Sequence, residues 1–306
     1  MNKEEVMVTI RCNTYNHELY IRQCLDGFVM QKTNFRFIAI VHDDASTDKT
    51  PNIIQEYANN YPEIIQPIFQ KENQYSKGFK EAGEMLIKLS LQTKYVAYCE
   101  GDDYWTDPLK LQKQFDFMES HPDYSACFHQ ALVHIEGGKN EDLLCGDIRN
   151  IDYTGTELYQ NSHRPPMASL FCKSEVLKST IYKRSQQAGL AFGDIPLFLS
   201  CANEGKVRGM SDVMSVYRKH QQGMTNTFNS GSKRLLRFAE SNLKLYTIFG
   251  NQYKKECIKV YVIEYLNYFF INLQHGRFYI GSLLKVLFKY PIITLGFIKE
   301  RLSLRI

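Results

Sequence analysis

The first 135 residues alternate between apolar runs, which are typical of buried strands, and amphipathic stretches, which are typical of helices. The apolar runs that predict strands occupy residues 6–12, 35–43, 63–70, 94–101 and 124–135. Apolar side chains recur every three or four positions in the intervening segments 20–31, 51–61, 81–92 and 107–120. Because such alternation builds parallel strands joined by helices, we predict a doubly wound, mostly parallel α/β sheet.

The rest of the chain changes character twice. Residues 136–232 are mixed, with strand signals at 168–172 and 207–217 and a helical signal at 195–203. After the Gly-, Ser- and Asn-rich sequence NTFNSGSK, the chain becomes helical, basic and aromatic. We therefore predict a sheet domain at residues 1–232 and a helical appendage at residues 233–306.

Charge distinguishes the same two parts. Residues 233–306 contain 13 Lys and Arg against 4 Asp and Glu, whereas the first 232 residues contain 24 against 29. A basic appendage on an acidic domain favours an anionic surface as the partner of the appendage alone. We expect no nucleic-acid partner.

The segment 278–298 is apolar over nearly the length that spans a bilayer. Lys285 and Lys289 lie within it and Pro291 interrupts it, which disfavours a spanning helix. We predict helices lying on the inner, anionic leaflet of the cell membrane, with both lysines contributing to lipid binding. The alternative is a helical subdomain that packs on the catalytic domain.

The cysteines and the N-terminus bear on the compartment. The eight cysteines are scattered without a C-x-x-C pair, which argues against a zinc ribbon and fits a reducing environment. No apolar signal core precedes the first predicted strand. We expect a cytoplasmic protein that is peripheral on the inner face of the membrane.

Three predicted strands end in polar clusters: NTYNHE after the first, HDDASTD after the second and EGDDYW after the fourth. In an open parallel sheet, ligands bind beyond the carboxyl ends of the strands. Asp43, Asp44, Asp102 and Asp103 would repel one another at one rim unless a cation lies among them. Carboxylate oxygens suit Mg²⁺ and Mn²⁺, often together with substrate phosphates.

At this point the chain resembles the family-2 glycosyltransferases of the GT-A fold, over roughly residues 6–220. The resemblance is carried by TYNHE-x-Y-I-x-x-C-L, HDDASTDKT, EGDDYWTDPLKLQKQ, GDIPLFL and MSVYRKH, in that order. It implies a nucleotide-sugar donor, UDP-linked by preference, and an acceptor that is a saccharide or a lipid-linked saccharide. It also implies a divalent cofactor, Mn²⁺ or Mg²⁺.

The resemblance assigns roles to the residues at the strand ends. Tyr15 looks like a platform for the nucleobase, and Asp44 looks like the partner of the base or ribose. Asp103 would bind the metal, on a solvent-facing rim, while Asp102 would bind the donor ribose or support the metal through water. A metal there stabilises the charge that develops on the leaving diphosphate.

The last two motifs imply the remaining roles. Asp194, before a predicted helix, would be the catalytic base that deprotonates the acceptor hydroxyl. Arg218 would bind a phosphate in bidentate fashion. His220 would complete the metal shell or donate to the diphosphate, and the residues leave both roles open.

We therefore predict inverting, metal-dependent transfer of a single sugar, in surface polysaccharide assembly. Processive relatives use Q-x-x-R-W, whereas the single tryptophan, Trp105, follows EGDDY and is either a wall of the sugar pocket or half-buried packing. HRPPM, with His163 and Arg164, resembles a loop near the acceptor. The alternatives are a nucleotidyltransferase, disfavoured because NTYNHE lacks a Gly-rich phosphate loop, and an inactive nucleotide-sugar-binding protein.

Overall fold

The structure is a computed structural model, and it describes residues 5–78, 80–138, 143–159, 165–221, 223, 232–276 and 279–303. The chain divides into two compact units. The first unit comprises Met1–Ser179 and Phe198–His220, and the second comprises Thr180–Leu197 and Gln221–Ile306. Residues 180–197 therefore cluster with the C-terminal helices, although they precede the last strand of the sheet.

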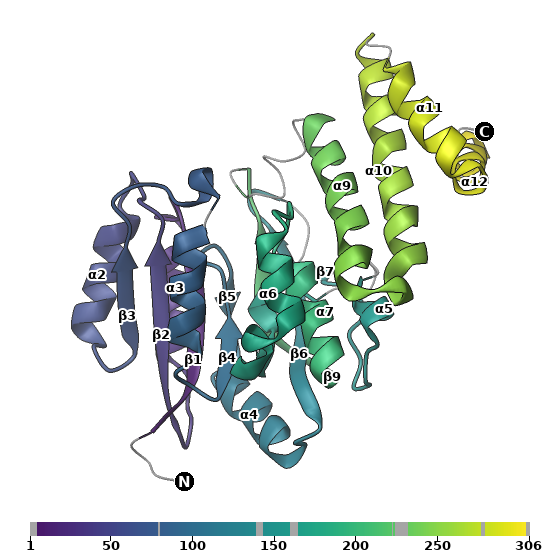
Figure 1. Cartoon of the computed structure of the whole chain (residues 1–306). Coiled ribbons are helices and arrows are strands. Elements are labelled where there is room, and N and C mark those ends of the chain that lie inside the picture. The colour runs from purple at the N-terminus through teal and green to yellow at the C-terminus, as the bar shows by residue number, and fades with distance from the viewer. Residues whose placement is uncertain are drawn as a thin grey trace. The chain divides into compact units, whose positions relative to one another are not determined.

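The first unit begins with parallel strands that alternate with helices. The strands β1 (Val6–Thr14), β2 (Arg36–Asp43), β3 (Ile65–Phe69) and β4 (Tyr95–Tyr98) run parallel in the order β3-β2-β1-β4 (Figure 1). The connecting helices are α1 (Ile21–Val29), α2 (Thr50–Asn60) and α3 (Lys80–Ser90). The predicted alternation of strand and helix is confirmed.

The sheet continues beyond β4 in mixed orientation. A short strand, β8 (Phe171–Lys173), lies antiparallel between β4 and β6 (Tyr124–Ile135). β6 is parallel to β9 (Lys206–Lys219), and β5 (Tyr104–Trp105) is antiparallel to β9. The remaining elements of this part are α4 (Lys110–Ser120), β7 (Leu143–Leu144) and α5 (Gly155–Tyr159).

Trp105 belongs to the core of the first unit rather than to a pocket wall. Its side chain is 2% exposed, and its indole N–H donates to the carbonyl of Ala168 at 2.8 Å. The ammonium nitrogen of the buried Lys110 lies 3.8 Å from the centre of a Trp105 ring. The interpretations of Trp105 as a sugar-pocket wall and as half-buried are therefore wrong.

The second unit is helical, as predicted for residues beyond 232. It contains α6 (Thr180–Gln187), α9 (Ser232–Phe249), α10 (Lys254–Gln274), α11 (Ile280–Lys289) and α12 (Pro291–Ser303), together with the start of α7 (Asp194–Glu204). Ala239, Tyr261, Val262, Leu266 and Val286 form its apolar core. Among the helices that the structure describes, none combines the length and the apolar character needed to cross a membrane.

Candidate active site

The loops that follow β1, β2 and β4 meet at one edge of the sheet, because these neighbouring strands run parallel. The Asp44 N–H donates to the Thr14 carbonyl at 3.0 Å, and the Gly101 N–H donates to the Asn13 carbonyl at 2.9 Å. The polar clusters predicted from the sequence therefore lie side by side at the carboxyl ends of the strands, where open α/β sheets bind ligands.

Short polar side chains after β2 hold the loop after β1 in place. The backbone N–H of Asn16, whose φ is 54°, donates to Ser46 Oγ at 2.8 Å. The next two backbone N–H groups, those of His17 and Glu18, donate to Thr50 Oγ1 at 2.8 Å and to Asp48 Oδ2 at 3.0 Å. The HDDASTD motif thus positions the loop that carries Tyr15 and His17.

Two histidines and one aspartate from three separate segments converge at this edge. His17 follows β1, Asp102 follows β4 and His220 follows β9, and each offers a ligand atom within 4.8 Å of the others. His220 Nε2 lies 3.0 Å from Asp102 Oδ2, and His17 Nε2 lies 3.9 Å from the same oxygen. The Tyr20 ring packs against the His220 ring at a tilt of 49°, with ring centres 4.5 Å apart.

The chemistry of this cluster fits a divalent cation. Nδ1 of His17 is buried and has no hydrogen-bond partner among the described residues. Burial lowers the pKa of His17, which favours the neutral imidazole that a metal requires. Burial alone would raise the pKa of Asp102, but the hydrogen bond with His220 and the charges of both histidines hold it below its usual value. Two imidazoles and a carboxylate form a set of ligands that suits a divalent transition metal.

Asp103 points away from the solvent, contrary to the expectation of a solvent-facing rim. It is 3% exposed, and its Oδ1 accepts the backbone N–H of Arg218 at 2.9 Å. Burial and the neighbouring charge of Asp102 raise the pKa of Asp103 well above its usual value. The rim position is therefore wrong for Asp103, whereas Asp102 lies in the cluster with both histidines.

The Arg218 guanidinium is engaged by protein groups on every side. Nε donates to the carbonyl of Asp102 at 2.9 Å, and the two terminal nitrogens donate to Glu136 Oε2 at 2.7 Å and to Gln23 Oε1 at 2.6 Å. The rings of Tyr20 and Tyr104 lie on the cation at 4.9 and 5.1 Å. In this arrangement Arg218 holds the Asp102–Asp103 turn against β9. These three bonds use three of the five N–H donors of the guanidinium, and the predicted phosphate contact stays a prediction.

The two predicted nucleoside-binding residues differ in accessibility. The side chain of Tyr15 is 44% exposed beside the cluster loops. Asp44 is 5% exposed, and its two carboxylate oxygens accept the backbone N–H groups of Gln74 and Tyr75 at 2.6 and 3.0 Å. Tyr15 is thus placed to stack on a base, while Asp44 holds the segment 74–75 at the rim. Both base-binding roles stay predictions.

Asp194 belongs to a different unit from the other predicted site residues. It is the first residue of α7 and belongs to the second unit, whereas Tyr15, Asp102, Arg218 and the other predicted site residues belong to the first. His163 and Arg164 lie outside the described residues. The role of Asp194 as catalytic base stays a prediction.

Sequence reasoning missed two residues at this rim, His17 and Glu100. Burial and the charge of Asp102 raise the pKa of Glu100 to about 7. The signal that could have found His17 is topological, because any polar side chain just after β1 adjoins the residues just after β4. His17 has no sequence spacing to His220 that would mark the two as ligands of one metal.

Gly101 provides a direct test of how closely these loops approach. A Cβ at this position would lie 2.7 Å from Thr14 Cβ and 3.0 Å from His17 Nδ1. We expect Gly101→Ala to displace the loop after β1, to lower the free energy of unfolding by about 1–3 kcal/mol and to weaken donor binding. Chemical denaturation and donor titration measure the two effects.

Gly296→Ala is the control for Gly101→Ala, since a Cβ there meets no atom within 4 Å. Its helical position in α12 should make alanine neutral or stabilising. If Gly101→Ala unfolds at the wild-type denaturant concentration and binds donor normally, the close approach of these loops is not important for the site.

A family model and several similar proteins identify the family of this chain. Residues 12–174 match the family described as glycosyl transferase family 2. The uncharacterized protein Rv1520 of Mycobacterium tuberculosis is 34% identical over 223 residues, which cover 69% of this chain and 58% of that protein. The minor teichoic acid biosynthesis protein GgaA of Bacillus subtilis is 24% identical over 93% of this chain and 60% of its own length. The chain thus spans about three fifths of these relatives.

Solved structures share the fold at low sequence identity. TarS residues 1–349 of S. aureus, in complex with UDP-GlcNAc, align with a TM-score of 0.57 and 17% identity over 87% of this chain and 73% of that chain. The mannosyltransferase PcManGT of Pyrobaculum calidifontis, in complex with GDP-Man and Mn²⁺, aligns with a TM-score of 0.57 and 15% identity over 98% and 80%. The predicted GT-A fold is confirmed, and the chain belongs to glycosyl transferase family 2.

Proposed function

We propose that the protein transfers a single sugar from a nucleoside-diphosphate sugar, by preference a UDP-sugar, to an acceptor hydroxyl, with inversion and with a divalent metal. The observation that carries the proposal is the cluster of His17, Asp102 and His220 at the carboxyl edge of the sheet. The family and the nucleotide sugars named with TarS and PcManGT support the donor class. Release after each transfer follows from the absence of a Q-x-x-R-W motif.

The ligand set favours Mn²⁺ over Mg²⁺ as the cofactor. Imidazole nitrogens suit transition metals, whereas Mg²⁺ prefers a shell made of oxygen atoms. Asp102 and His220 would bind the ion directly, with His17 as the third ligand and Asp103 behind them. When bound, the ion acts as a Lewis acid that stabilises negative charge on the leaving diphosphate.

The remaining steps fall to side chains of the chain itself. The exposed ring of Tyr15 would stack on the nucleobase, and Asp44 would fix the base or ribose. Asp194 would take the proton of the acceptor hydroxyl while that oxygen attacks the anomeric carbon. The N-terminus of α7 favours a negative charge on Asp194. One displacement of this kind inverts configuration and needs no covalent sugar intermediate.

The names of two relatives support a proposal for the acceptor and the biological setting. GgaA is named for minor teichoic acid biosynthesis, and a second relative of Bacillus subtilis, TuaG, is named as a putative teichuronic acid glycosyltransferase. We propose a saccharide or lipid-linked saccharide acceptor in surface polysaccharide assembly. Residues 1–232 would form the catalytic domain, and residues 233–306 would place it on the inner face of the cell membrane.

A donor-hydrolysis screen across nucleotide sugars tests the proposed activity. We expect hydrolysis of one donor to be lost with a chelator and restored by Mn²⁺ more fully than by Mg²⁺, with a metal stimulation on the order of tenfold or more. Release of the nucleoside diphosphate is the readout.

The same screen separates catalysis from binding. Tight donor binding without turnover under every metal condition would favour the inactive nucleotide-sugar-binding protein. Equal turnover with chelator and with Mn²⁺ would contradict the role of the metal.

A further inference from the structure

Large apolar side chains line the outward face of α11 and α12. Ile280, Leu284 and Phe288 follow one another at intervals of four on α11, and Ile292 and Leu295 continue the series on α12. Phe288 is 81% exposed and Ile292 is 86% exposed, more than any other large apolar side chain among the described residues. We call these five residues the apolar stripe. Water-exposed apolar side chains in such a series mark an interaction surface.

The opposite face of α11 packs on the core of the second unit, which leaves the apolar stripe facing outward. Val286 is fully buried in the core of the second unit, and Leu283 and Tyr290 pack against that core. When a helix carries apolar residues on two faces, one face is buried in the protein core. The other face stays exposed and can bind a partner.

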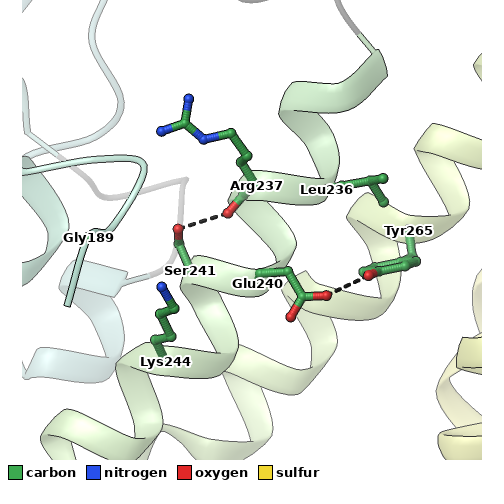
Figure 2. Close-up of a pocket in the computed structure, with 7 residues that line it drawn as sticks. All are labelled: Gly189, Leu236, Arg237, Glu240, Ser241, Lys244 and Tyr265. Carbon is green, nitrogen blue, oxygen red and sulfur yellow. Dashed lines mark hydrogen bonds between the residues drawn. The ribbon is translucent and has the colours of Figure 1, made fainter. Parts of the chain in front are cut away.

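A half-exposed lysine, Lys285, also holds α11 in this orientation. Lys285 Nζ donates to the Tyr265 hydroxyl at 2.7 Å and to Glu240 Oε1 at 3.1 Å. Tyr265 in turn donates to Glu240 at 2.5 Å, beside a cavity of about 410 Å³ (Figure 2). The three residues join α9, α10 and α11. The side chain of Lys285 is still 49% exposed, so the expectation that it contributes to lipid binding stays a prediction.

The charge around the stripe identifies the kind of partner. Lys289 and Lys299 are exposed on the same two helices, and residues 279–303 contain four Lys and Arg against one acidic residue. Protein–protein interface cores are depleted of lysine, whereas helices at a bilayer surface combine apolar residues with flanking Lys and Arg. Both helices are also shorter than a bilayer-spanning helix.

We propose that the apolar stripe inserts into the headgroup–acyl boundary of an anionic bilayer, with Lys289 and Lys299 at the phosphate level. This assigns a lipid-contacting face to the peripheral membrane association proposed above, on which it rests. Burial of the apolar stripe contributes to the free energy of membrane binding, and salt does not weaken this contribution. The two lysines add an electrostatic contribution that salt screens.

Co-sedimentation with vesicles of phosphatidylcholine, with or without phosphatidylglycerol, tests the stripe in the full chain. We expect Phe288→Ser together with Ile292→Ser to reduce partitioning onto both kinds of vesicle by about tenfold or more. Lys289→Gln together with Lys299→Gln should reduce binding by about threefold to tenfold on the anionic vesicles alone, and high salt should remove this difference.

Leu143→Ser together with Leu144→Ser is the matched control, because both leucines are more than half exposed and lie in the first unit. We expect wild-type partitioning for this variant. Donor hydrolysis in the same samples should be equal for all variants, so a failure of the catalytic proposal is seen separately. Circular dichroism should show wild-type unfolding, because Phe288 and Ile292 are exposed.

Three results would overturn the proposal. Wild-type protein that binds neither kind of vesicle has no lipid-contacting face of this kind. A Phe288 and Ile292 double variant that partitions as well as wild type excludes the stripe as that face. A wild-type dimer that ignores vesicles and becomes monomeric on the same double substitution identifies a second copy of the chain as the partner.

Discussion

Asp102→Asn is expected to lower Mn²⁺ affinity and sugar transfer by on the order of 100-fold or more. Asp102 is the only carboxylate of the metal cluster, and it is the residue near which both His17 and His220 lie. The amide keeps the shape of the side chain and can still accept a hydrogen bond, but it removes the negative charge. Mn²⁺ binding by electron paramagnetic resonance gives a readout that does not depend on activity.

Asp103→Asn is the informative comparison for Asp102→Asn. Asp103 is buried and accepts the backbone N–H of Arg218, a bond that an asparagine oxygen can keep. We expect Mn²⁺ affinity to fall much less than for Asp102→Asn. Asp116→Asn, on the exposed side of α4, should match wild type. If Asp103→Asn loses Mn²⁺ while Asp102→Asn keeps it, Asp103 is the direct ligand, as the family resemblance implies.

Asp194→Asn is expected to reduce transfer at saturating donor by on the order of 100-fold or more while leaving donor affinity nearly unchanged. The amide can preserve hydrogen bonding at the start of α7, but it cannot accept the proton of the acceptor hydroxyl. Donor affinity by calorimetry and transfer rate under saturation measure the two effects separately.

Glu256→Gln is the matched control for Asp194→Asn. Glu256 lies in the first turn of α10, so the substitution removes a comparable first-turn charge from another helix of the second unit. It should change stability by less than about 1 kcal/mol and leave transfer unchanged. An Asp194→Asn variant that loses donor binding but transfers at the wild-type rate under saturation would make Asp194 a binding residue.

Most helices and strands could be predicted from the sequence, because each has its own periodic spacing of apolar residues. The runs 6–12 and 35–43 became β1 and β2, and the amphipathic segment 20–31 became α1. Strand orientation was less accessible. The strand signal at residues 168–172 anticipated β8, but it did not show that β8 runs antiparallel between β4 and β6.

The acidic rim was predictable for a topological reason. Neighbouring parallel strands end at the same edge, so polar residues just after β1, β2 and β4 must lie close together. That argument predicts which loops form the site. It does not predict which way each side chain turns, because adjacent residues in one loop can face opposite directions.

Sequence alone determined the α/β sheet, its helical appendage and the edge of the sheet that carries the acidic residues, because periodicity is a local property and neighbouring parallel strands end at the same edge. Tertiary structure decided that Asp102 faces the histidines while Asp103 turns inward, and that His17 joins His220 across 203 positions of the chain. It also decided that Lys285 turns towards Glu240. Each of these depends on contacts between segments far apart in sequence, where burial and charge pairing select one direction for a side chain that the local pattern leaves open.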